Sequence, residues 1–240
     1  MEAADIKGLL GLLLVDGSLN QYRTPRGGYV QLTLTGGVTE AAFLGEKVAE
    51  FRQFIPTKAE ITPYQTAARF SKKPNAQGVI DRSQPRHTTV LRFRVSTNKL
   101  RPVYNLLYPD GSREITEAVL EMLGGQAAAW AWAEGGRLNE DGSSELARCG
   151  TTVEEAVRIS HWLRTLTGAE SELSENEVLT KPRLKFTSAN TEKLQNNLRA
   201  YAPKSRKHLF HERQIHKGGP ELVPGEGDDV PAREQEAAVA

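Results

Sequence analysis

An apolar segment near the start of the chain ends abruptly on an acidic residue. In the stretch LLGLLLVDGS, every residue from 9 to 15 is apolar or glycine, and Asp16 follows with no polar residue before it. The leucine spacing predicts a helix over residues 5–15 that stops at Asp16-Gly17, because glycine readily adopts the left-handed conformation that ends helices. Taken alone, this ending indicates an ordinary helix terminus. A carboxylate at the end of so apolar a helix nevertheless needs an explanation.

The order of predicted elements occurs twice. A second apolar helical region, residues 115–136, also ends on an acidic residue and a glycine, and its Glu134 follows Asp16 by 118 residues. Hydrophobic periodicity predicts helix, two strands, helix, two strands and helix in each half. The sequence therefore predicts an α+β fold of two αββαββα halves, residues 1–114 and 115–212. The further predicted elements lie at 29–37, 38–55, 59–66, 88–97 and 98–108, and at 136–150, 152–168, 181–189 and 190–202, the last capped by Asn190 or Thr191.

Charge separates the end of the chain from the rest. The 240 residues carry a net charge of +1, but residues 221–240 hold six acidic residues and one arginine, so residues 1–220 carry +6. The basic part favours an anionic partner. Residues 213–240 are predicted to form a disordered acidic tail, because a segment rich in Pro, Gly and Glu buries too little apolar surface to fold.

Composition excludes several classes of protein. The apolar runs are far shorter than the ~20 residues that a membrane-spanning helix needs. The N-terminus lacks the basic region of a signal peptide, so the expected location is the cytoplasm, or an organelle matrix for an organelle-encoded gene. The single cysteine, Cys149, excludes an intramolecular disulfide and a cysteine-cluster metal site, and we expect it to be buried.

The two acidic motifs and their flanks resemble the LAGLIDADG homing endonucleases, in the single-chain form with two motifs. The residues of LLGLLLVDG that match the family's nine-residue motif are Leu9, Gly11, Leu12, Asp16 and Gly17. The second copy, AAAWAWAEG at 127–135, is more degenerate and keeps chiefly Glu134 and Gly135. Residues 96–123 and 188–209 are similar to further segments of the family. The resemblance extends from about residue 5 to residue 212.

This resemblance implies a pseudo-twofold fold in which the two motif helices pack against each other beneath a saddle of antiparallel DNA-binding strands. Gly11 and the alanines of the second motif would let the helix backbones approach closely. Asp16 and Glu134 would then meet beside the DNA. Neighbouring carboxylates repel each other unless a cation lies between them, and Mg²⁺ (or Mn²⁺) suits such a pair. The metal would activate water for phosphodiester hydrolysis.

Basic residues near the motifs are further candidates for catalysis. Arg113 stands where relatives often have a lysine ahead of the second motif, and Lys207 and His208 stand near the end of the resembling region. Arginine cannot act as a general base, so Arg113 could stabilise phosphate charge but not accept a proton. Lys207 and His208 are equally well explained as solvated basic residues.

In this family, side chains on the outward face of the strands contact bases or phosphates. The corresponding candidates are polar or basic residues of the predicted strands, and each alone is equally well explained as part of a solvated strand face. They are Arg23, Arg26, Gln31, Thr33, Arg92 and Arg94 in the first half, and Arg137, Asn139, Arg183 and Lys185 in the second.

The leading functional hypothesis is a monomeric, Mg²⁺-dependent endodeoxyribonuclease that cuts a long asymmetric double-stranded DNA target, as in intron homing. The target is expected to be asymmetric because the two halves differ in sequence. The alternative is a cleavage-deficient nucleic-acid-binding relative, or a maturase that binds intron RNA. The drift of the second motif leaves both hypotheses open.

Overall fold

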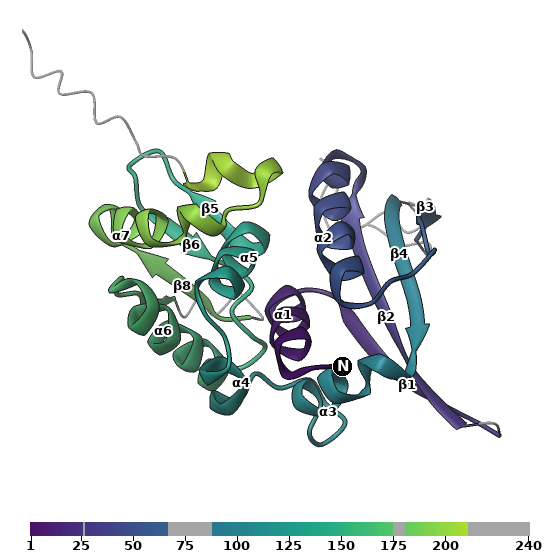
Figure 1. Cartoon of the computed structure of the whole chain (residues 1–240). Coiled ribbons are helices and arrows are strands. Elements are labelled where there is room, and N and C mark those ends of the chain that lie inside the picture. Colours follow the sequence, from purple (N-terminus) through teal and green to yellow (C-terminus); the bar gives the residue numbers. More distant parts are fainter. Residues whose placement is uncertain (26, 67–87, 175–180, 211–240) are drawn as a thin grey trace, which may run out of the picture.

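The computed structural model describes residues 1–25, 27–66, 88–174 and 181–210 (Figure 1). The first half comprises α1 (Ala3–Leu13), β1 (Ser18–Thr24), β2 (Gly27–Gly37), α2 (Ala41–Phe54), β3 (Ile61–Gln65), β4 (Thr89–Thr97) and α3 (Arg101–Leu107). The second half comprises α4 (Glu117–Glu121), α5 (Gly125–Gly135), β5 (Gly136–Leu138), β6 (Ser144–Leu146), α6 (Val153–Thr167), β7 (Glu172–Ser174), β8 (Arg183–Phe186) and α7 (Ser188–Leu198). A 3₁₀ helix, Lys204–Phe210, ends the described region. The predicted order of elements is confirmed, with α4 as an additional helix ahead of the second motif.

Within the described ranges, each half contains one four-stranded antiparallel sheet. The strand order is β1-β2-β4-β3 in the first sheet and β5-β6-β8-β7 in the second, so the two halves share one topology. The sheets lie on opposite sides of the central helices α1 and α5 (Figure 1). On β2, Val30, Leu32 and Leu34 are buried and alternate with more exposed polar residues, which is the pattern of a sheet with one covered face.

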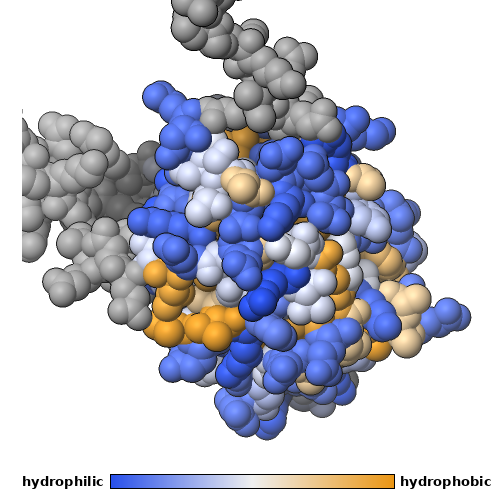
Figure 2. Space-filling model, turned by 90° about the vertical axis from the view of Figure 1, so that its left-hand side faces the viewer, coloured by the Kyte–Doolittle hydropathy of each residue, from blue (hydrophilic) through white to orange (hydrophobic). Residues whose placement is uncertain are grey.

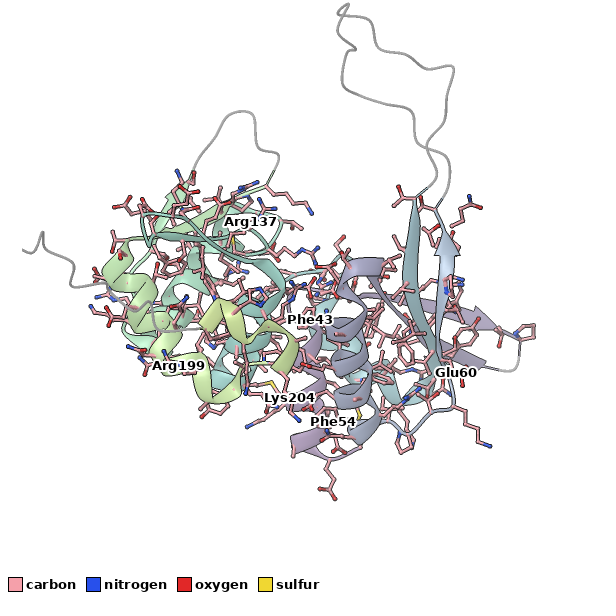
Figure 3. The ribbon with its side chains drawn as sticks, turned by 90° about the horizontal axis from the view of Figure 1, so that it is seen from above. Phe43, Phe54, Glu60, Arg137, Arg199 and Lys204 are labelled. Atoms are coloured by element: carbon pink, nitrogen blue, oxygen red, sulfur yellow. The ribbon has the colours of Figure 1, made fainter. Side chains whose placement is uncertain are left out.

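The two central helices approach each other closely, as the small residues of the motifs predict. A Cβ atom added to Gly11 would lie 2.9 Å from the Cβ of Ala127, closer than such atoms come in proteins. Large side chains fill the space around this contact. Trp130 of α5 stacks on Phe43 of α2 with ring centroids 5.7 Å apart, and Figure 3 shows Phe43 where the two halves meet. The apolar character of both motifs is therefore explained by packing.

Three local details complete the comparison with the sequence. The first helix ends at Leu13, so Asp16 lies in the turn that follows it. The predicted cap of the last helix is wrong, because α7 begins at Ser188 and the Thr187 hydroxyl accepts the hydrogen bond from the Asn190 N–H. Cys149 is buried, as expected, and burial raises the pKa of its thiol to about 11.

The outer surface of the second half is largely hydrophilic, with hydrophobic side chains gathered in the lower part of the view in Figure 2. Helix α6 shows how this surface is built: Ile159 and Leu163 are buried, whereas Val157 is exposed. Among the described residues, no helix combines the length and the hydrophobicity needed to cross a bilayer.

Candidate active site

Asp16 is held in a tight turn between α1 and β1. Gly17 has a φ of 82°, a left-handed conformation that glycine adopts without strain, and a Cβ added there would lie 2.8 Å from a methyl carbon of Leu34. The Arg113 guanidinium donates hydrogen bonds to the carbonyls of Leu13, Leu14 and Gly17, at 3.1 Å for Leu14 and 2.6 Å for Gly17. Arg113 thus binds two carbonyls at the end of α1 and one in the turn beyond Asp16.

Glu134 is positioned differently, because it belongs to the last turn of α5 rather than to a turn beyond it. The neighbouring Gly135 allows Arg148 to approach, since a Cβ added to Gly135 would lie 3.0 Å from the backbone nitrogen of Arg148. The two acidic side chains have exposed fractions of 15% for Asp16 and 11% for Glu134. Both carboxylates are therefore largely withdrawn from solvent.

Lys47 of α2 joins the two carboxylates. Its ammonium contacts Oδ2 of Asp16 and lies 2.7 Å from Oε2 of Glu134, and only 4% of its side chain is exposed. Arg148 contacts the other oxygens: its Nη1 forms an ion pair with Oε1 of Glu134 and lies 3.5 Å from Oδ1 of Asp16. The two carboxylates, one from each motif, thus converge on two cations. The two carboxylates thus lie close together, as the resemblance implies; that they lie beside DNA stays a prediction.

The electrostatic environment keeps Asp16 ionised. Burial disfavours the charged form and raises the pKa of Asp16. The charge and hydrogen bond of Lys47, the backbone N–H of Gly17 and the charge of Arg148 act in the opposite direction, and together they hold the pKa of Asp16 below its usual value. Asp16 is therefore a carboxylate, a ligand for cations, at neutral pH.

Two cavities flank the carboxylates. The cavity on the Asp16 side measures about 450 Å³, and its lining includes Asp16, Arg113, Arg148, Glu155 and Lys181. The cavity on the Glu134 side measures about 270 Å³, and its lining includes Glu40, Glu134, Arg137, Arg148 and Arg206. Arg148 borders both. Each motif carboxylate therefore borders its own cavity, and in each cavity three basic side chains face two acidic ones, an excess that favours an anionic ligand.

The basic residues proposed from the sequence are not all at these cavities. Arg113 borders the cavity beside Asp16. Lys207 and His208 are exposed on the 3₁₀ helix, whereas the preceding residue, Arg206, borders the cavity beside Glu134. The guanidinium of Arg206 pairs with Glu40 and lies 4.6 Å from the centre of the Phe43 ring. Arg206 is thus the described residue of this helix that is placed to act near Glu134.

The first sheet carries most of its candidate DNA contacts on one face. Cross-strand pairs place Gln31 opposite Ser96 and Thr33 opposite Arg94, all alternating with buried positions such as Leu32 and Phe93. Arg92 is on the same face, and its guanidinium stacks 3.7 Å from the centre of the Tyr64 ring. Arg23 does not share the face expected for these candidates. It pairs with Gly28, and strand alternation places it on the same face of β1 as the buried Leu19. Arg26 lies outside the described residues.

The candidates of the second sheet are interleaved with acidic residues. Arg137, Glu145 and Lys185 are cross-strand neighbours, and Glu172 pairs with Lys185 from the other side. The Nη1 of Arg183 lies 2.7 Å from Oε1 of Glu145, and that of Arg137 lies 4.0 Å from the same oxygen. Asn139 follows β5 in the turn, where its amide donates to the Ser143 hydroxyl. The basic side chains of this face are thus partly neutralised within the sheet.

Sequence reasoning missed Lys47, Arg148 and Arg206. A signal for Lys47 is present, because it follows Leu44 by three residues and precedes Phe51 by four, which places a charged residue inside the apolar stripe of the predicted helix. Arg148 and Arg206 lie in irregular or 3₁₀ segments, where no periodicity predicts the direction of a side chain. Their roles depend on contacts between the two halves.

The donor chemistry of the pair suits a hard divalent cation. Within the described ranges, no group of three or more His, Cys, Asp or Glu residues forms a complete metal cage. Mg²⁺, however, is typically bound by one or two carboxylates and keeps several waters or substrate phosphate oxygens as further ligands. Asp16 and Glu134 meet this requirement, and the flanking cavities leave room for water and phosphate.

The fold matches solved structures of homing endonucleases. The homing endonuclease I-WcaI bound to its DNA recognition sequence aligns with a TM-score of 0.62 at 12% identity, over 86% of this chain and 85% of that one. Mesophilic variants of the homing endonuclease I-DmoI align with a TM-score of 0.53 at 13% identity, over 87% of this chain and 97% of that one. I-DmoI in complex with DNA and Mn aligns with a TM-score of 0.51 at 13% identity, over 82% and 97%. At these identities the likeness shows a shared fold.

Comparison of the sequence with protein-family models identifies the family. No curated protein sequence matches the chain significantly. The model of the LAGLIDADG DNA endonuclease family matches residues 6–194, which include both acidic motifs and both sheets. The chain therefore belongs to the LAGLIDADG DNA endonuclease family, as its motifs and the pairing of its two central helices indicate.

Proposed function

We propose that this protein is a site-specific endonuclease that cuts double-stranded DNA with the help of a divalent cation, Mg²⁺ or Mn²⁺, held by Asp16 and Glu134. The observation that carries this proposal is the convergence of the two motif carboxylates, with Lys47 and Arg148, between two sheets whose uncovered faces are polar. Family membership supports a nuclease, and the I-WcaI and I-DmoI structures with DNA support a duplex as the ligand.

The position of each residue suggests its role in cleavage. Asp16 and Glu134 would bind the cation and orient water, and the cation, when bound, would lower the pKa of that water and offset charge on the phosphate. Arg148 borders both cavities and is placed to contact a phosphate on either side. Arg113 is a positioning residue, because it holds the backbone carbonyls on either side of Asp16. One chain supplies both carboxylates, so we propose that it acts as a monomer.

The first experiment is to find the target and test cleavage. Duplexes selected from a randomised library by binding in Ca²⁺ would be cloned into a supercoiled plasmid, which is then incubated with the protein in Mg²⁺ or Mn²⁺. We expect linear product from the wild type and none from Asp16→Asn. If the plasmid stays intact with both metals while binding persists, the protein is a cleavage-deficient DNA-binding relative; if it binds structured RNA and no duplex, it is a maturase.

A further inference from the structure

Lys47 is an unusual residue to find between two metal-binding carboxylates. Its side chain is more deeply buried than either partner, with 4% exposed against 15% for Asp16 and 11% for Glu134. A buried ammonium is costly unless ion pairs compensate for its lost hydration. This one ammonium donates hydrogen bonds to Oδ2 of Asp16 and to Oε2 of Glu134. Lys47 therefore serves as the counter-ion of the pair.

The charge balance of the cluster is already complete without a metal. Two carboxylates face one lysine and one arginine, and each carboxylate contacts Lys47 through one oxygen and Arg148 through the other. A divalent cation would compete with Lys47 for Oδ2 of Asp16 and Oε2 of Glu134. With Lys47 in place, the cation would also be repelled by a like charge at contact distance.

We propose that Lys47 competes with the divalent cation for the two carboxylates. Its ammonium keeps the metal affinity of the DNA-free protein low, and it moves away from the carboxylates when a metal ion binds. This inference rests on the proposed function of Asp16 and Glu134 as metal ligands. Nζ also lies 5.2 Å from the centre of the Phe43 ring, which Trp130 and Arg206 contact as well. The phosphates of a bound duplex would provide an anionic partner for the displaced ammonium. Metal loading would then be coupled to DNA binding.

The test measures Mn²⁺ binding to the full-length protein without DNA, by the electron paramagnetic resonance signal of free Mn²⁺. Lys47→Met should bind Mn²⁺ at least about 10-fold more tightly than the wild type, since a competing charge in contact with the ligands is removed. Lys47→Arg, which keeps the charge, should stay close to the wild type. Lys204→Met removes an exposed lysine from the 3₁₀ helix (Figure 3) and is the matched control for net charge. Adding Asp16→Asn to Lys47→Met should abolish the gain.

A second measurement uses the unaltered protein and does not depend on the folding of a variant. Saturating Mn²⁺ should raise the acylation rate of the Lys47 amine several-fold, measured by peptide mass spectrometry, while the rate at Lys204 stays constant. Equal Mn²⁺ affinity in the wild type and Lys47→Met, or an unchanged acylation rate at Lys47, overturns the proposal. If Lys47→Met binds Mn²⁺ more tightly but the wild-type protein does not cut DNA, the nuclease function is refuted and the competition stands.

Discussion

The two sheets share one topology but differ in size and in charge. The strands of the first sheet contain 7, 11, 5 and 9 residues, whereas those of the second contain 3 or 4 residues each. On the first sheet, Arg92 and Arg94 have polar, uncharged cross-strand neighbours. On the second sheet, Glu145 lies among three basic residues and pairs with Arg183. Duplicated architecture therefore does not imply equal roles, and the first sheet is the better candidate for phosphate binding.

The largest expected effect is on the cleavage rate, when the acidic residue of the first half is replaced. Asp16→Asn should lower the cleavage rate by at least about 100-fold, because loss of the proposed metal ligand would displace the reacting groups. Duplex affinity in Ca²⁺ should change no more than a few-fold, as measured by fluorescence anisotropy. Equal losses of binding and cleavage would assign Asp16 to the structure of the turn instead.

The next effect distinguishes the two motifs from each other. Glu134 has one methylene more than Asp16 and belongs to a helical turn, so the two cleavage centres should differ in efficiency by up to about 100-fold, the effect of an ~1 Å displacement. A supercoiled plasmid carrying the target should pass through an open-circular intermediate. Glu134→Asp should change the ratio of the two strand-cleavage rates. If the wild type yields linear DNA with no nicked intermediate, the two centres are equivalent.

The charge difference between the sheets predicts unequal losses of affinity. Arg94→Ala should weaken duplex binding by about 10-fold at low salt and reduce the salt slope by about 1, because it would remove a proposed phosphate contact whose cross-strand neighbour, Thr33, is uncharged. Lys185→Ala, on the corresponding strand of the second sheet, should weaken binding by less than about 3-fold, because its cross-strand neighbours Glu145 and Glu172 are acidic and would repel the same phosphate. Titrating the salt dependence of duplex affinity for both variants tests this difference. Equal salt slopes for the two variants would contradict the prediction.

The smallest effect should be a gain. Glu145→Gln removes the acidic partner of Arg183 and Arg137, so it should tighten duplex binding by a few-fold at low salt and leave it almost unchanged at high salt. Glu114→Gln, which removes an acid paired with Arg158 away from this sheet, is the control. Weaker binding by Glu145→Gln at low salt would mean that the carboxylate contacts the DNA directly.

The sequence predicted the repeat, the positions of β2 and β4 and the two acidic residues because each is a local pattern, whereas β1 and β7 had no predicted range. Alternation marks β2 and β4, and Gly168, with a φ of 70°, ends α6 where predicted. The environment of the carboxylates could not be predicted in the same way. Lys47 comes from the first half and Arg148 from the second, and only packing of the two halves brings them together. Arg113 illustrates the same limit, because its carbonyl partners lie about 100 residues away in the chain.

The close contact between Gly11 and Ala127 also constrains how such a protein can evolve. A larger side chain on either helix would separate the helices and move the two acidic residues apart, so a substitution at one position requires a matching change at the other. The outward faces of the sheets carry no such constraint, since their side chains project to solvent. Substitutions on the outward faces should therefore be tolerated more readily than substitutions at this helix contact. This division allows a new sequence preference to arise without rebuilding the cleavage centre.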